Sequence, residues 1–154
     1  MSNDTFLKLD GITGESQDGL HPGEIEVLNW SWKMSQQSSM MSGSGGGAAK
    51  ANVEDLIVFH QVDRASPNLM SFCLTGRHIP KAVLTMRKAG GVPVDFLKIT
   101  MSDVIIAGVE MSPNYEQIRL SFARVRQEYM VQAATGGSGG AVTATFDIKR
   151  NSSA

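Results

Sequence analysis

The sequence has little of what several protein classes require. It contains one cysteine, Cys73, in 154 residues, which excludes an internal disulfide and suits a reducing compartment. No apolar run approaches the roughly 20 residues that span a bilayer, and the N-terminal segment lacks a basic stretch followed by an apolar one. We therefore expect no membrane insertion, synthesis in the cytoplasm and no cleavable signal peptide.

The chain also lacks an excess of charge of either sign. Its 14 Lys and Arg residues face 15 Asp and Glu residues, which gives a formal net charge of -1. Proteins that bind nucleic acid neutralise phosphates with clustered Lys and Arg, whereas the basic residues here alternate with acidic ones. We expect no nucleic-acid partner.

No set of residues with the spacing of a metal or catalytic site is present. His21, His60 and His78 fall in different predicted elements, and none has a zinc-ligand spacing. Cys73 and His78 do not make a credible thiolate pair, because Cys73 lies on the expected buried face of a helix. We predict no catalytic residue, no cofactor and no metal, and therefore no enzyme.

Two short glycine-rich segments match the residue pattern of known motifs, one catalytic and one that binds dinucleotides, but lack the secondary structure that these motifs need. Residues 136–140 read G-G-S-G-G, but a nucleophile elbow needs a helix behind it, and a strand pattern follows here. Residues 43–48 fit G-x-G-x-x-A without the βαβ unit that binds a dinucleotide. Both segments are predicted to be loops.

What the sequence does contain is a series of short segments with strand periodicity. They alternate apolar and polar residues and end at Gly, Pro, Asn or Asp. The predicted fold class is mainly β, a curled barrel or sandwich of about eight strands in one domain over residues 1–154. The predicted strands cover residues 5–10, 24–34, 52–62, 82–88, 94–101, 103–111, 117–132 and 141–148.

Two of these segments change their apolar face partway along. The face changes between Val27 and Leu28, and again in residues 117–132, where Ile118 and Phe122 occupy even positions but Val125 an odd one. A strand cannot change face without a bulge or a sharp twist. We expect both strands to bend and the sheet to curl.

One segment, at about residues 67–75, has the residues that typically start and end a helix. Ser66 is a suitable cap, Pro67 fits the first helical position and Gly76 can end the helix. Leu69 and Phe72 then share one apolar face with Cys73. So short a helix is not stable alone, and we expect this face to pack on the sheet.

A long loop rich in Gly, Ser and Met, at about residues 35–50, is the most informative irregular segment. Unstructured connections of more than roughly 12–15 residues are functional or disordered in compact domains. Composition leaves two interpretations open, a solvated linker or a loop that orders against another subunit. The strand before the loop also leaves two interpretations open. Trp30 and Trp32 are expected in the core. Asn29 and Ser31 on the opposite face then point either into bulk solvent or into a shared channel.

Several joined motifs closely resemble the hemolysin-coregulated protein family, the tube subunit of bacterial type VI secretion. They run in order over nearly the whole chain, and together they are more specific than any short pattern above. The matching segments are residues 6–12, 14–16, 24–28, 30–32, 34–36, 50, 52–53, 66–70, 87–91, 129, the glycine cluster at 136–140 and 146–148, with His21.

The resemblance implies a hexameric ring of β-barrel-like subunits, stacked into a tube that can hold effector cargo. Its partners would be further copies of the chain, effectors, and the sheath and spike of the secretion machine, which exports it without a signal peptide. Carried over by position, Asn29 and Ser31 are candidates for the channel wall. The candidates for contacts between subunits or rings are Gln36, Gln37, Met40, Met41 and Lys50.

Two other functions fit the same residues. A phage tail-tube subunit would share the ring architecture. A monomeric binding protein would use the loop rich in Gly and Met to hold a small ligand, and would be recognised by its size in solution and by saturable binding.

Overall fold

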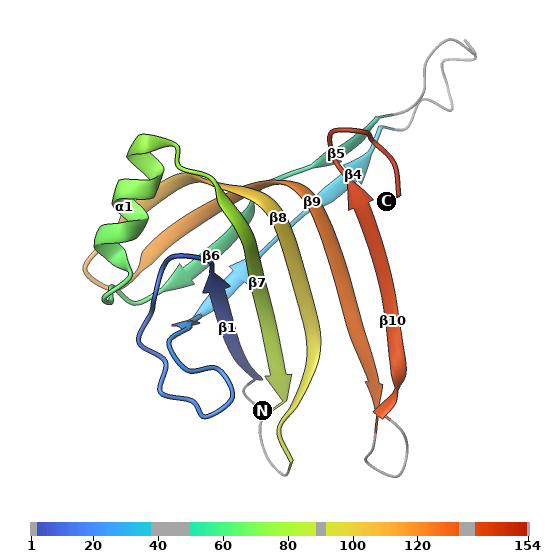
Figure 1. Cartoon of the computed structure of the whole chain (residues 1–154), viewed down its shortest axis with the longest axis horizontal. Helices are drawn as coiled ribbons and strands as arrows, with labels where there is room; N and C mark the ends of the chain where they lie inside the picture. Colours follow the sequence, from blue (N-terminus) through green and yellow to red (C-terminus); the bar gives the residue numbers. More distant parts are fainter. Residues whose placement is uncertain (1–2, 38–49, 89–91, 133–137, 154) are drawn as a thin grey trace.

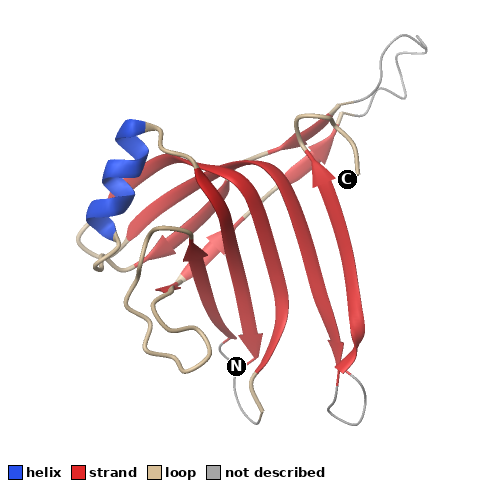
Figure 2. Cartoon of the chain, in the orientation of Figure 1, coloured by secondary structure: helices blue, strands red, loops and turns tan. Residues whose placement is uncertain are grey.

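The computed structural model describes residues 3–37, 50–88, 92–132 and 138–153. Within these residues the chain forms one helix and ten strands, most of them in a curled sheet (Figures 1 and 2). The predicted mainly β fold with one helix is confirmed for this part of the chain. The elements are β1 Asn3–Leu9, β2 Ile25–Glu26, β3 Asn29–Ser31, β4 Met34–Gln36, β5 Ala51–Val53, β6 Leu56–His60, α1 Ser66–Thr75, β7 Ile79–Lys88, β8 Val94–Met111, β9 Glu116–Gln132 and β10 Ser138–Asp147.

The main sheet is curled and open, and its two edge strands are consecutive in the chain. Its strand order is β2-β1-β7-β8-β9-β6-β3, with every pair antiparallel, so β2 and β3 lie at opposite ends of the order. Only two residues separate them in the chain. The Val27 amide donates to the carbonyl of Thr5 in β1, and the Leu28 amide donates to the carbonyl of Phe59 in β6. The predicted change of face between Val27 and Leu28 therefore lies at the corner where the chain passes from one edge of the sheet to the other.

Strand β9 carries the second predicted bend. Its first half pairs with β6, from Glu116 to Leu120, and its second half pairs with β10, from Arg124 to Gln132. Between them Phe122 and Ala123 are both buried, although neighbouring residues of a regular strand point to opposite faces. The bend thus lies where β9 stops pairing with β6 and starts pairing with β10.

Several of the predicted strands need correction. The two strands predicted at residues 94–101 and 103–111 are one strand, β8, in which Asp103 adopts a φ of 53°. The segments predicted over residues 24–34 and 52–62 are instead divided into short strands, β2 to β4 and β5 to β6. Asp103 is one of the residues that tolerate positive φ, so it bends β8 without ending it.

Helix α1 lies at one end of the curled sheet and packs mainly against β8 (Figure 1). Leu69 and Phe72 enter the core, and Gly76 ends the helix with a left-handed φ of 64°. The predicted cap is wrong, because Ala65 occupies the N-cap position and Ser66 is the first helical residue. The Ser66 side chain instead donates to Glu116 across the helix-to-sheet junction.

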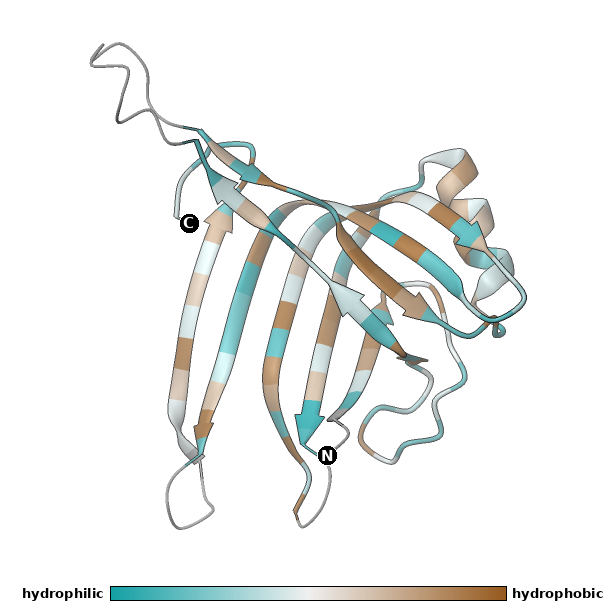
Figure 3. Ribbon diagram, turned by 180° about the vertical axis from the view of Figure 1, so that it is seen from behind, coloured by the Kyte–Doolittle hydropathy of each residue, from teal (hydrophilic) through white to brown (hydrophobic). Residues whose placement is uncertain are grey.

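The core lies on the inner side of the curl. Hydropathy alternates along the strands, as the ribbon in Figure 3 shows. Leu7, Leu84, Ile99 and Leu120 are almost fully buried on this side. Trp30 and Trp32 are half-buried against the same cluster, which confirms the predicted orientation of both indoles.

The segment between β1 and β2 folds over the outer side of β1. Arg87 on β7 makes two hydrogen bonds to Asp18, at 2.8 Å and 2.6 Å, and one to Asp4 at 3.0 Å. His21 stacks on the ring of Phe6, with 4.4 Å between centroids. The Arg87 hydrogen bonds hold the pKa of Asp18 well below its usual range. This tether buries Phe6 on a sheet face that would otherwise be exposed.

Candidate functional site

The inner face of the sheet is covered only in part. Cross-strand neighbours on β8, β9 and β10 form rows, of which one joins Met101, Val125 and Phe146. In that row Met101 is fully buried. Further along the same face, Tyr129 is 43% exposed and its partner Val142 is 62% exposed. The same face of the sheet is therefore buried at Met101 and exposed at Tyr129 and Val142.

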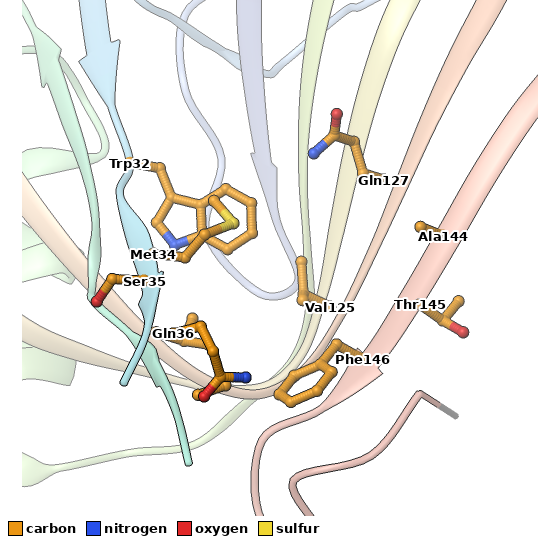
Figure 4. A pocket seen from close by; sticks show the side chains of 11 residues that line it. Trp32, Met34, Ser35, Gln36, Val125, Gln127, Ala144, Thr145 and Phe146 are labelled. Carbon is orange, nitrogen blue, oxygen red and sulfur yellow. The ribbon is translucent and has the colours of Figure 1, made fainter. Parts of the chain in front are cut away.

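An apolar groove lies at the upper end of this uncovered face. It has a volume of about 500 Å³ between the β4–β5 ribbon and strands β9 and β10. Trp32 and Met34 project into it from the ribbon side, opposite Val125 and Phe146 (Figure 4). The indole N–H of Trp32 donates to the Glu54 carbonyl, which fixes the ring as one wall. The lining residues are Trp32, Met34, Ser35, Gln36, Ala51, Val53, Val125, Gln127, Ala144, Thr145 and Phe146.

We name the groove and the exposed inner face at Tyr129, Val131 and Val142 the open face. Tyr129 and Val131 were predicted to lie on the same side of β9 as Val125, and they do. Val125 is buried but the other two are exposed, although the ring of Phe96 on β8 makes an edge contact with that of Tyr129, with 6.2 Å between centroids. Contiguous exposed apolar surface of this kind marks a site for a partner or a ligand.

The ribbon carries several of the residues predicted for contacts between subunits. Strands β4 and β5 pair with each other, with Gln36 opposite Ala51, and extend away from the main sheet (Figure 1). Gln36, Gln37 and Lys50 are all exposed near the ribbon end, and Gln36 lines the groove. The predicted residues Met40 and Met41 lie outside the described residues.

The two candidates for a channel wall lie on the opposite side of the sheet from the core. Asn29 and Ser31 are exposed on β3, whereas Trp30 between them turns toward the core. Ser31 pairs with Ile57 of β6, and both line a hollow of about 310 Å³. The two candidates thus share a small, polar patch on one face.

The residues examined for catalysis do not converge. His78 is exposed after α1, while Cys73 is half-buried against the core. His21 and His60 are each held by carboxylates in separate places, His21 by Glu24 and Asp95. No group of three or more His, Cys, Asp or Glu side chains among the described residues is placed to hold a metal ion.

Two polar networks, one partly and one fully buried, were missed by the sequence analysis. Arg87 with Asp18 and Asp4 is one, and His60 with Glu116 is the other. Their members are 56 to 83 positions apart in the chain. No local spacing signals such pairs, because strand pairing and loop closure bring them together.

The chain was compared with known families and structures. A family model described as "Type VI secretion system effector, Hcp" matches residues 6–129. The protein hcp1 of Pseudomonas aeruginosa is 43% identical over 159 aligned residues, which cover 98% of each chain. The crystal structure of Hcp1 from Salmonella typhimurium covers all of both chains at 46% identity with a TM-score of 0.84. A type VI secretion system effector from Yersinia pestis matches at 38% identity, with a TM-score of 0.77, over 94% of this chain and 99% of that one.

These matches to the curled β-sheet chain identify it as a type VI secretion protein. The chain belongs to the Hcp family, the hemolysin-coregulated proteins. No helix in the described part of the chain is long and apolar enough to cross a membrane.

Proposed function

We propose that this chain is the structural tube subunit of a type VI secretion system, in which six copies close into a ring and rings stack into an exported tube. The observation that carries the proposal is the open face. It is the continuation of the core of the same strands, from Met101 at 0% exposure to Val142 at 62%. A second copy is the occupant we propose, because it would complete a core that one chain leaves unfinished.

A closed ring needs two unlike surfaces on each subunit, so that every copy contacts the next in the same way. The open face with its groove supplies one of them. The β4–β5 ribbon, which extends beyond the sheet, is the proposed element that reaches the neighbour. Gln36, Gln37 and Lys50 at the end of the ribbon, together with Met40 and Met41 of the sequence prediction, are the proposed contacts between subunits or rings.

The polar patch at Asn29 and Ser31 is proposed to face the channel. Both side chains are small and exposed on the side away from the core. A channel wall of such residues leaves room for effector cargo and does not trap it by apolar contact. In this proposal the protein works by assembly and not by bond-breaking chemistry, together with the sheath and spike components, and leaves the bacterial cytoplasm through the secretion machine.

The experiment compares two valine-to-lysine variants. Val142 lies on the open face at 62% exposure, and Val62 is 50% exposed elsewhere on the molecule. Light scattering on a size-exclusion column, combined with negative-stain imaging, is expected to show rings of six for the wild type and for Val62→Lys. Val142→Lys is expected to elute as a folded monomer of 16.6 kDa, because burying an unpaired ammonium in an apolar contact is strongly unfavourable.

The comparison contradicts the proposal in two cases. One is a wild type that stays monomeric at high concentration. The other is a Val142→Lys variant that assembles as well as Val62→Lys, which would move the contact away from the open face. Circular dichroism of both variants establishes that neither is simply unfolded.

A second candidate function is supported by the groove itself. Its volume of about 500 Å³ and mainly apolar lining are those of a small-molecule site. A monomer that binds an apolar ligand with saturation, and loses that binding in Phe146→Asp, would favour this function over the ring.

A further inference from the structure

A buried polar array joins helix α1 to the sheet. His60 ends β6 and lies in register with Glu116 at the start of β9. Both side chains are fully buried, and His60 Nε2 is 2.7 Å from Glu116 Oε1. The Ser66 hydroxyl at the start of α1 donates to the same oxygen at 2.9 Å. One carboxylate oxygen thus holds a strand and a helix together.

The hydrogen bonds leave one nitrogen of the His60 ring unpartnered. The Ser66 hydroxyl accepts from the Asp63 amide, so its own proton is free to reach Glu116. Glu116 Oε1 thus lies within hydrogen-bond distance of both Ser66 Oγ and His60 Nε2, while Glu116 Oε2 is buried without a hydrogen-bond partner among the described residues. The other ring nitrogen, Nδ1, has no hydrogen-bond partner among the described residues and is buried.

The Asp63 carboxylate faces that unpartnered nitrogen. Its Oδ2 atom lies 3.7 Å from His60 Nδ1, close enough for an ion pair but too far for a good hydrogen bond. If neither atom carried a proton, a lone pair and a carboxylate would face each other in a site of low polarity, which is costly. One proton between the two atoms removes that conflict.

Asp63 also shapes the start of the helix. Its Oδ1 atom accepts from the Ala65 amide at 2.8 Å, and its carbonyl accepts from the Ser66 amide at 3.0 Å. Movement of Asp63 therefore disturbs the turn on which α1 begins. The helix in turn carries Leu69 into the core and places Cys73 half-buried against it.

We propose that Asp63, His60 and Glu116 form a proton-operated latch that fastens the start of α1 to the sheet. With one proton held between His60 Nδ1 and Asp63 Oδ2 the latch is closed. When that proton is lost as the pH rises, the two acceptors repel, the Asp63 turn moves outward and α1 loosens. The latch does not depend on assembly and goes beyond the proposed tube function.

The charges around Asp63 favour retention of the proton. Burial raises the pKa of the Asp63 carboxyl, and the nearby carboxylates of Glu15 and Glu116 raise it further, while the Ala65 amide and His60 act in the opposite direction. Arg64, the next residue, offers its backbone amide to Glu15. The first turn of α1 contributes no acidic residue.

The sign of the pH effect follows from this direction. A raised pKa means that the folded protein holds the proton more tightly than the unfolded chain does. The stabilisation from Asp63 is therefore complete at low pH and is lost as the pH rises through the value in the folded state.

The test uses Asp63→Asn and the natural thiol of the helix. The amide keeps an oxygen for Ala65 and offers a permanent N–H to His60, so the variant should stay latched at every pH. Cys73 is the only cysteine in the chain, and its reaction with a chromogenic aromatic disulfide reports opening of α1. Asp10→Asn, at an exposed position, is the control for loss of one charge.

All three proteins are labelled at the same pH, because the thiolate fraction then cancels in the comparison. We expect equal rates at the acidic end of the pH range in which the protein stays folded and, at the alkaline end, labelling of Asp63→Asn at least about fivefold slower than that of the wild type and of Asp10→Asn. Hydrogen exchange of the α1 amides should follow the same order. Equal labelling and equal exchange in the three proteins across the pH range would overturn the latch.

Discussion

Replacing Gly14 by alanine tests how the segment between β1 and β2 is held together. A Cβ atom at Gly14 would lie 2.6 Å from the Glu24 carbonyl oxygen and 2.8 Å from the Ile25 nitrogen. Both contacts are with backbone, which cannot rotate away as a side chain can. The two chain segments must therefore separate.

The free-energy cost of this separation follows from the hydrogen bonds that it breaks. Three backbone hydrogen bonds join the segments, from the Gly14 amide to Gly23 at 2.8 Å, from Ser16 to Glu24 at 2.9 Å and from Gly23 back to Ser16 at 2.8 Å. At about 1 kcal/mol for each net hydrogen bond, their loss costs about 3 kcal/mol. In a domain of this size that lowers Tm by roughly 6–12 °C.

Gly19 in the same segment provides the matched control. No atom lies within 4 Å of the position where its Cβ would stand. Gly19→Ala should change the free energy of unfolding by no more than about 0.5 kcal/mol, or raise it slightly by restricting the unfolded chain. Urea unfolding of both variants at one protein concentration measures the difference. Equal destabilisation by the two alanines would refute the reasoning.

Two further predictions concern the tether and the helix. Because Arg87 holds the pKa of Asp18 below its usual range, the stability that this carboxylate contributes is present above about pH 4 and is lost as the pH falls further. Asp18→Asn should therefore unfold more easily than the wild type at pH 7, and the difference should shrink toward pH 2 in a series of urea titrations. Leu69 is fully buried on α1, whereas Leu74 is 78% exposed, so Leu69→Ala should cost about 2–5 kcal/mol of unfolding free energy and Leu74→Ala less than about 0.5 kcal/mol. Similar costs for the two leucines in calorimetry would show that α1 does not pack as described.

Local chemistry explains which predictions from the sequence were right. Pro67 and Gly76 bracket α1 because each has a backbone preference that acts without help from the rest of the chain. The changes of apolar face after Val27 and before Val125 located both bends, since a strand has only two faces. The resemblance of the joined motifs also led to the correct family.

The errors arose where a distant partner overrides a local signal. Ser66 has a side chain that commonly caps helices, yet its hydroxyl donates a hydrogen bond to Glu116, 50 positions away. The sequence placed a break before Asp103, but β7 and β9 pair with β8 on both sides of it and keep the strand continuous. A one-dimensional pattern contains neither partner.

The alternation of residues was enough to establish a curled β protein with one helix, because side-chain direction along a strand repeats every two residues whatever surrounds it. The open face could be identified only in three dimensions. Val125 and Val131 have the same periodicity and the same chemistry, and they differ in burial because packing layers lie over one and not over the other. Which apolar residues remain available to another molecule depends on that covering, and the covering is a property of the folded chain.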